Sequence, residues 1–105
     1  MSGGHWEYVG YRIQEDLFSI STDEIVEQRW PIIASMVNVL GEWVYDVERD
    51  MDFDLCSDAE IPDDTAFDQQ KAGKLVTELM KFLPDEWFPN GKWATIQAFQ
   101  GRSGL

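Results

Sequence analysis

The chain has 105 residues, of which 44% are hydrophobic and 13% aromatic. This length fits one domain, and so aromatic a composition excludes a disordered chain because it supplies enough apolar surface to offset the entropy lost on ordering. Its 20 Asp and Glu against eight Lys and Arg give a net charge of −12, which repels nucleic acid and anionic membranes and attracts basic proteins or cations.

The sequence shows no sign of membrane insertion or secretion. No stretch reaches the roughly 18 apolar residues of a membrane span, and the first residues lack the basic and apolar regions of a secretory signal. Cys56 is the only cysteine, so no internal disulfide can form. We therefore expect a cytoplasmic protein with a single domain over residues 1–105 and flexible ends at residues 1–5 and 101–105.

The two ends of the chain, residues 5–13 and 93–100, are short and aromatic, and their periodicity fits either a strand or a helix. Trp93 and Thr95 alternate as in a strand, whereas Trp93 and Ile96 fit one face of a helix. We expect two short helices here, and the alternative is that the two ends pair as two strands.

A helix start is predicted at Ser21, because Glu24 follows three residues later as in a capping box. This short helix would run from Thr22 to about Arg29. Pro31 interrupts it and opens the next helix, since proline is tolerated in the first turn but not in a helix interior.

Residues 31–51 carry the clearest helical pattern of the chain. Apolar side chains recur there mainly at spacings of three and four residues: Ile33, Met36, Val37, Leu40, Val44, Val47 and Met51. This stripe predicts a helix. Ile32, Val39 and Trp43 widen it, so we expect a central helix that is buried on more than one side. Gly41 lies inside the pattern and costs up to about 1 kcal/mol relative to Ala, which a close helix crossing at this position would explain.

A third helix is expected after an acidic segment. Asp63 or Asp64 can cap it, its apolar face runs over residues 67–83, and Pro84 ends it because helices usually stop before a proline. The sequence Pro89-Asn90-Gly91 then marks a turn. The fold predicted from these elements is mainly α, a small bundle of three to five helices.

The acidic segment, residues 46–68, holds ten acidic residues and one basic residue, Arg49. The motif Asp50-x-Asp52-x-Asp54 opens like an EF-hand loop, but Leu55 and Ile61 stand where that loop needs Gly and Glu. We interpret the segment as a solvated loop that caps helices and keeps the protein soluble. The alternatives are a weak divalent-cation site and a docking surface for a basic partner.

No cofactor or metal is predicted. His5 is the only histidine, so the paired His or Cys spacings of zinc sites do not occur, and no phosphate-binding glycine loop is present. Aromatic residues near the C-terminus either cap the core or form a partner-binding patch. The candidate partner-binding residues are therefore Asp50, Asp52, Asp54, Asp58, Trp87, Phe88 and Trp93.

The sequence does not specify a function, but its charge favours a non-catalytic acidic protein that binds a basic protein partner. An immunity-type protein and a nucleic-acid mimic are special cases of this hypothesis. A helical oligomerising or structural protein and an enzyme with a carboxylate-bound metal are the alternatives, and the oligomeric state is left open.

Overall fold

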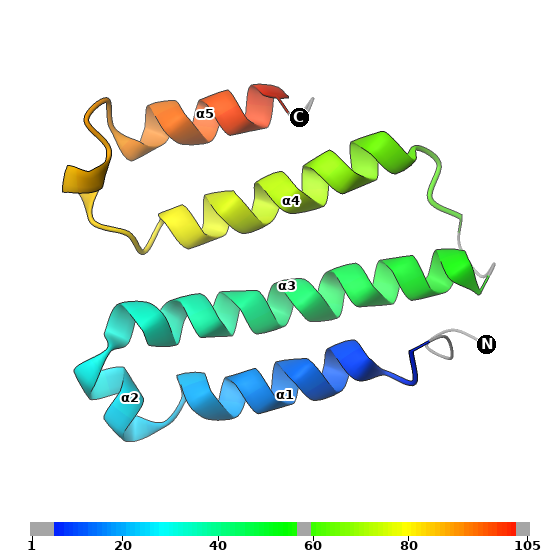
Figure 1. Ribbon diagram of the computed structural model, residues 1–105, viewed down its shortest axis with the longest axis horizontal. Helices are drawn as coiled ribbons and strands as arrows, with labels where there is room; N and C mark the ends of the chain where they lie inside the picture. Colours follow the sequence, from blue (N-terminus) through cyan, green and yellow to red (C-terminus); the bar gives the residue numbers. More distant parts are fainter. Residues whose placement is uncertain (1–5, 57–59, 103–105) are drawn as a thin grey trace. The chain divides into compact units, whose positions relative to one another are not determined.

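The computed structural model describes residues 6–56 and 60–102, and within these it holds five α-helices, one 3₁₀ turn and no strand (Figure 1). The prediction of a small, mainly α protein is confirmed. Both ambiguous ends are helical in the described residues. The elements are α1 (Val9–Ser21), α2 (Glu24–Arg29), α3 (Pro31–Leu55), α4 (Asp64–Met80), the 3₁₀ turn η1 (Asp85–Trp87) and α5 (Lys92–Arg102).

The chain forms two compact units, unit 1 over Met1–Pro62 and unit 2 over Asp63–Leu105. The single domain expected from the length therefore stays a prediction. Of the two ends expected to be flexible, residues 1–5 and 103–105 lie outside the described residues, whereas Gly101 and Arg102 belong to α5.

Unit 1 is a helical hairpin in which α1 and α3 pack side by side and run in opposite directions, with α2 at their junction (Figure 1). The short helix expected over residues 5–13 is longer in the structure, where α1 spans Val9–Ser21. Ile13, Leu17 and Ile20 continue the spacing of three and four residues that an amphipathic helix requires.

The N-cap of α2 is Asp23, and the prediction that Ser21 caps this helix is wrong. Oδ1 of Asp23 accepts hydrogen bonds from the backbone N–H groups of Ile25 at 2.9 Å and Val26 at 3.1 Å. Ser21 is instead the last residue of α1, where its hydroxyl donates to the carbonyl of Phe18 at 3.1 Å. A carboxylate at the cap satisfies two amides that have no partner inside the helix.

Helix α3 begins at Pro31 as predicted but runs to Leu55, four residues further than expected. Its apolar stripe is less buried than the pattern indicated. Ile33 is 54% exposed and Leu40 is 37% exposed, and Val47 is the one member of the seven-residue stripe that is buried. The expectation that this helix is buried on more than one side stays a prediction.

The buried face of α3 instead carries Ala34, Gly41 and Glu48, which are spaced seven residues apart. A Cβ atom placed on Gly41 would lie 3.4 Å from Cβ of Leu17 on α1, which confirms the close helix crossing predicted at this glycine. The mirror arrangement holds nearer the start of α1, where a Cβ atom on Gly10 would lie 2.8 Å from Cβ of Glu48.

In unit 2, α4 and α5 pack against each other, and Met80 and Ile96 are buried apolar side chains among the residues whose burial is described. Asp63 caps α4, since its Oδ1 accepts a hydrogen bond from the backbone N–H of Ala66 at 3.0 Å. The helix ends at Met80, so the prediction that Pro84 terminates it is wrong; two backbone turns come first.

The predicted turn before α5 is confirmed. Gly91 has a φ of +87°, a left-handed conformation that favours glycine, and its N–H donates to the carbonyl of Phe88 at 2.8 Å. Lys92 then joins three segments, because its Nζ lies 3.2 Å from Oδ1 of Asp85 and 3.3 Å from the carbonyl oxygen of Lys81.

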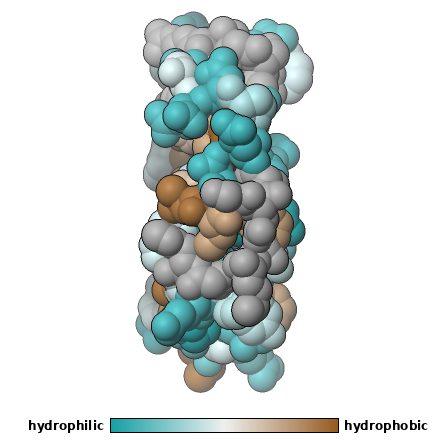
Figure 2. Space-filling model, turned by 90° about the vertical axis from the view of Figure 1, so that its right-hand side faces the viewer, coloured by the Kyte–Doolittle hydropathy of each residue, from teal (hydrophilic) through white to brown (hydrophobic). Residues whose placement is uncertain are grey.

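Apolar side chains are common on the surface of the described residues. Thirteen large hydrophobic side chains are exposed against four hydrophobic residues that are buried, and Figure 2 shows brown areas among the teal ones on the face that it draws. Six of the thirteen lie within residues 18–33, around α2: Phe18, Ile20, Ile25, Trp30, Ile32 and Ile33. In the described part of the chain, no helix combines the length and hydropathy needed to cross a bilayer.

Candidate functional site

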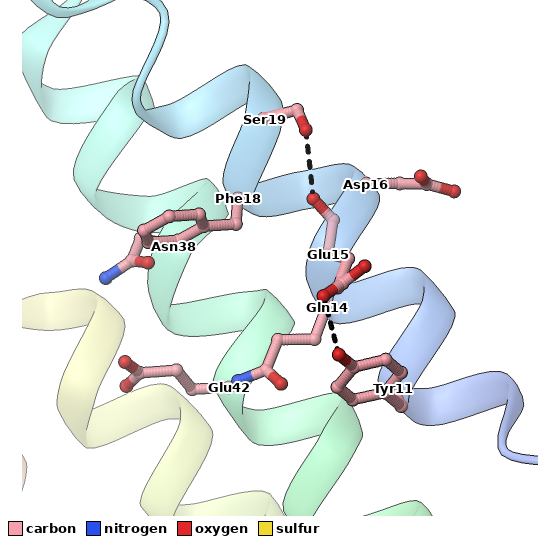
Figure 3. Close-up of a pocket in the computed structure, with 8 residues that line it drawn as sticks. All are labelled: Tyr11, Gln14, Glu15, Asp16, Phe18, Ser19, Asn38 and Glu42. Carbon is pink, nitrogen blue, oxygen red and sulfur yellow. Dashed lines mark hydrogen bonds between the residues drawn. The ribbon is translucent and has the colours of Figure 1, made fainter.

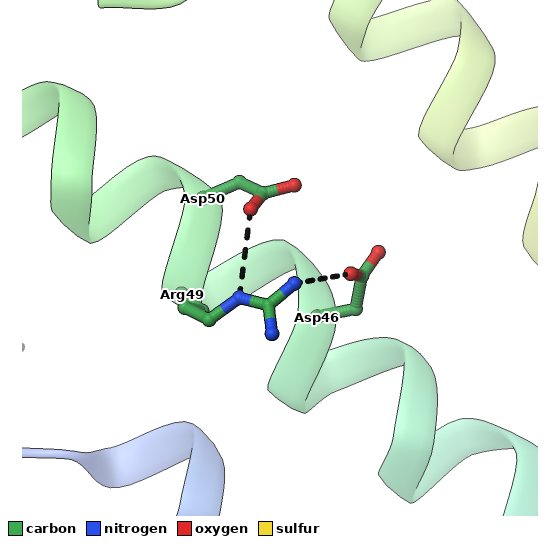
Figure 4. A network of polar contacts seen from close by, with 3 residues as sticks. All are labelled: Asp46, Arg49 and Asp50. Atoms are coloured by element: carbon green, nitrogen blue, oxygen red, sulfur yellow. Dashed lines mark hydrogen bonds and ion pairs between the residues drawn. The ribbon is translucent and has the colours of Figure 1, made fainter. Parts of the chain in front are cut away.

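Helix α3 divides the acidic segment between two faces, because residues four apart lie on the same side of a helix. Asp46 and Asp50 share one face, and Glu48 and Asp52 share another. The guanidinium of Arg49 lies between the first pair, with Nη2 3.1 Å from Oδ1 of Asp46 and Nε 3.7 Å from Oδ1 of Asp50 (Figure 4). The single basic residue of the segment therefore offsets part of the charge on its more exposed face.

The second face is buried. Asp52 has no exposed surface, and its Oδ1 accepts a hydrogen bond from Sγ of Cys56 at 3.3 Å. Glu48 is 9% exposed, and its Oε1 has no hydrogen-bond partner among the described residues. A fully buried carboxylate offers no surface to a partner, so Asp52 leaves the set of candidate contact residues.

The expectation of a solvated loop is wrong as far as Leu55, because the helical hydrogen bonding of α3 continues to that residue. Asp54 has a structural contact, since its Oδ2 accepts a hydrogen bond from the backbone N–H of Ile61 at 2.7 Å and so closes the segment after α3. Asp58 lies outside the described residues. Of the four predicted acidic contacts, Asp50 keeps a partly exposed carboxylate on the helix surface.

The aromatic candidates lie in unit 2. Trp87 is 61% exposed in η1 and Trp93 is 66% exposed in α5, whereas Phe88 is half-buried. Indole rings with this exposure do not cap the core. They remain available as a partner-binding patch, separate in sequence and in unit from the acidic residues of α3.

A groove lies between α1 and α3 in unit 1. Its larger hollow has a volume of about 510 Å³; α1 contributes Tyr11, Gln14, Glu15, Asp16, Phe18 and Ser19 to the lining, and α3 contributes Asn38 and Glu42. In Figure 3, Phe18 extends from α1 toward Asn38 on α3. The lining thus combines aromatic rings with carboxylates and amides.

A second hollow of about 300 Å³ shares Phe18 and Asn38 with the first, so the two adjoin, and we call them together the α1–α3 groove. The second hollow reaches α2 and the first turn of α3, where Glu27 and Pro31 line it. Of the described residues that line the groove, four are acidic and none is basic. The acidic ones are Glu15, Asp16, Glu27 and Glu42, all exposed.

Glu15 is held in place within the groove. The hydroxyl of Tyr11 donates to its Oε1 at 2.7 Å, and Ser19 Oγ donates to its backbone carbonyl at 3.1 Å (Figure 3). The hydrogen bond to Glu15 raises the pKa of Tyr11 above its usual 10.0, and the negative charge of the same carboxylate adds to this rise because it opposes a phenolate.

Sequence reasoning missed this groove because it assigned no structure beyond Ile13 in the first segment. The signal that could have found the α1 part is the spacing of Ile13, Leu17 and Ile20, which places Glu15 off the apolar face of a helix. The place of Glu42 in the groove could not be predicted from the sequence, because only the packing of α1 on α3 brings it there.

Charge is distributed unequally between the two units. Unit 1 contains 14 acidic residues against three basic ones, a net charge of −11, whereas unit 2 contains six against five, a net charge of −1. Within the described residues, no three His, Cys, Asp or Glu side chains converge to hold a metal ion. His5 lies outside those residues.

The helices and the groove define the class: a small all-helical protein whose negative charge is concentrated in one helical hairpin with an acidic groove. Comparisons with protein-family models, with curated proteins and with solved structures found no match.

Proposed function

We propose that this protein acts without catalysis, by binding a basic protein partner, and that unit 1 supplies the contact surface. The observation that carries the proposal is the uneven charge, because unit 1 holds nearly all of the net charge of the chain, −11 of −12. Like charges gathered in one hairpin repel each other and oppose folding. A basic partner would relieve this repulsion.

The same charge makes the association fast and sensitive to salt. Opposite potentials steer two proteins together at low ionic strength, and salt near physiological strength screens exposed charges beyond about 8 Å. Asp50 supports this function as a partly exposed acid of α3. An immunity-type protein and a nucleic-acid mimic are special cases of the proposal. The lone cysteine supports a cytoplasmic location, where thiols stay reduced.

A second candidate function is self-association, as a helical oligomerising protein. The observation that favours it is the cluster of exposed hydrophobic side chains within residues 18–33, among which Ile25 is 62% exposed and Ile33 is 54% exposed. Large exposed apolar patches mark protein interaction sites. The occupant of this cluster would be a second copy of the chain rather than a different protein.

The experiment is affinity capture from host lysate at low and at high salt, followed by measurement of the affinity of the captured protein. The proposal expects a basic protein that binds at low salt and is released at high salt. The double variant Asp50→Asn/Glu60→Gln neutralises two acids of unit 1 and should weaken binding and flatten its salt dependence.

The matched control is Asp68→Asn/Glu86→Gln, which removes the same charge from exposed positions of unit 2. Equal losses in the two double variants would contradict a contact surface in unit 1. If no basic protein is retained and the molecular mass of the protein rises with its concentration, self-association replaces partner binding as the function.

A further inference from the structure

The α1–α3 groove has an exposed aromatic side chain where its two hollows meet, and the charged residues among its described lining are all acidic. Phe18 lines both hollows and is 55% exposed, so its ring is available at the point where they meet. Acidic side chains stand at both ends, Glu15 and Glu42 in the larger hollow and Glu27 in the smaller one. No basic residue is among the described residues that line the groove.

We propose that the α1–α3 groove is the docking site for a basic amphipathic helix of the partner, with an apolar side chain against Phe18 and Lys or Arg side chains beside Glu15 and Glu42. This inference rests on the function proposed above and specifies where on unit 1 the partner binds. Laying the apolar face of a helix into a groove between two helices is a recurring mode of recognition, and an aromatic side chain at the centre is a favoured anchor.

The dimensions of the groove fit such a helix. Along α1 its lining runs from Tyr11 to Ser21, ten residue steps, which correspond to about 15 Å at the helical rise of about 1.5 Å per residue. A helix of about three turns covers this length. The carboxylates of Glu15, Asp16 and Glu42 flank the hollow in which it would lie.

Charge selects this occupant over a second copy of the chain. A second copy would bring a further net charge of −12 toward a groove whose rim is already acidic. Nucleic acid and anionic lipid are disfavoured for the same reason, since both carry negative charge. A segment with Lys and Arg around an apolar stripe matches both the rim and Phe18.

The test uses a synthetic helical peptide of about 14 residues, with Leu at the spacing of one helix face and Lys elsewhere. Its binding to the full chain is measured by isothermal titration at low and moderate salt. Two further peptides serve as controls. One carries Glu in place of Lys and tests the charge contacts, and the other carries Ser in place of Leu and tests the apolar contacts. Wild type should bind the Leu/Lys peptide, bind the Ser/Lys peptide more weakly, and not bind the Leu/Glu peptide.

The first variant is Glu15→Gln/Glu42→Gln, in which both side chains keep their shape and their capacity to accept hydrogen bonds. Its affinity for the Leu/Lys peptide should fall about three- to thirtyfold, the range expected when two exposed ion pairs are lost. The matched control Glu7→Gln/Glu24→Gln removes the same charge from exposed positions of unit 1 outside the groove. It should lower the affinity by less than about twofold, since distant exposed charges are screened.

A second pair of variants tests the apolar contact. Phe18→Ala should weaken the Leu/Lys peptide about fivefold or more, as expected for a central aromatic anchor, whereas Ile25→Ala should leave the affinity unchanged. Ile25 is as exposed as Phe18 but does not line the groove. Circular dichroism of each variant checks that the helical content is preserved.

The outcomes separate this inference from the proposed function. Equal losses in the two glutamate double variants would show that the peptide follows the overall charge of unit 1, which overturns the groove as the site and leaves partner binding standing. Absence of binding to wild type, or equal binding of the Leu/Glu peptide, also overturns the groove, and lysate capture then decides the function separately. A dimer of the wild type that Phe18→Ala converts to a monomer would make a second copy the occupant.

Discussion

Gly10 of α1 faces Glu48 of α3 so closely that a Cβ atom placed on the glycine would lie 2.8 Å from Cβ and 3.0 Å from Oε2 of the glutamate. Further along the same two helices, a Cβ atom on Gly41 would lie 3.4 Å from Cβ of Leu17, an ordinary contact distance. The two glycines therefore differ in the space beside them, although both are buried where α1 and α3 cross.

The first prediction follows from this difference. Gly10→Ala should lower the free energy of unfolding by about 1–3 kcal/mol, because the new methyl group overpacks against Cβ and Cγ of Glu48. Gly41→Ala should be neutral or raise it by up to about 1 kcal/mol, because alanine restricts the unfolded chain in mid-helix and fits the space. Denaturant unfolding followed by circular dichroism measures both. A stabilised Gly10→Ala variant would contradict the close contact.

The second prediction concerns the cap of α4. Asp63→Ala should cost about 0.5–2 kcal/mol, because the backbone N–H of Ala66 loses its acceptor at the start of the helix. Asp63→Asn is the matched control, since its side-chain carbonyl can still accept this hydrogen bond, and it should remain close to wild type. Thermal unfolding of the three proteins gives the comparison, and an Asn variant as unstable as the Ala variant would exclude the cap.

The third prediction concerns Tyr11 and pH. The hydrogen bond and the charge of Glu15 raise the pKa of Tyr11 above 10.0. Because the pKa is raised in the folded protein, this interaction stabilises the fold below pH 10 and is lost as the pH rises through the raised pKa. Ultraviolet titration of tyrosinate should show a late phase that Tyr11→Phe removes and that Glu15→Gln shifts to lower pH. A late phase unaffected by Glu15→Gln would assign it to another cause.

The fourth prediction compares two residues of the apolar stripe of α3. Val47 is 8% exposed and Ile33 is 54% exposed. Val47→Ala should cost about 2 kcal/mol, since two buried carbon groups are lost and a cavity remains, whereas Ile33→Ala should cost about 1 kcal/mol or less although more atoms are removed. Unfolding in urea measures the loss in free energy of unfolding for each variant. A larger loss at Ile33 would mean that this side chain is covered in solution, which the self-association hypothesis requires.

The sequence by itself determined α2, α3 and α4 and several of the residues at which helices and turns begin. Helix formation depends on local periodicity, caps and proline positions, so Pro31 marks the start of α3, Asp63 caps α4 and Gly91 makes the turn before α5. Net charge is also a property of composition alone. These signals act within a few residues and need no knowledge of the partner helix.

The tertiary structure alone decided which side of each helix is buried. An apolar stripe shows that a helix has a preferred face, but α1 packs tightly on α3 at Gly10, where the absence of a side chain leaves room for Glu48. The same packing buries Asp52, which the sequence placed in a contact surface. It brings Glu15 of α1 and Glu42 of α3, 27 residues apart in the chain, to one groove.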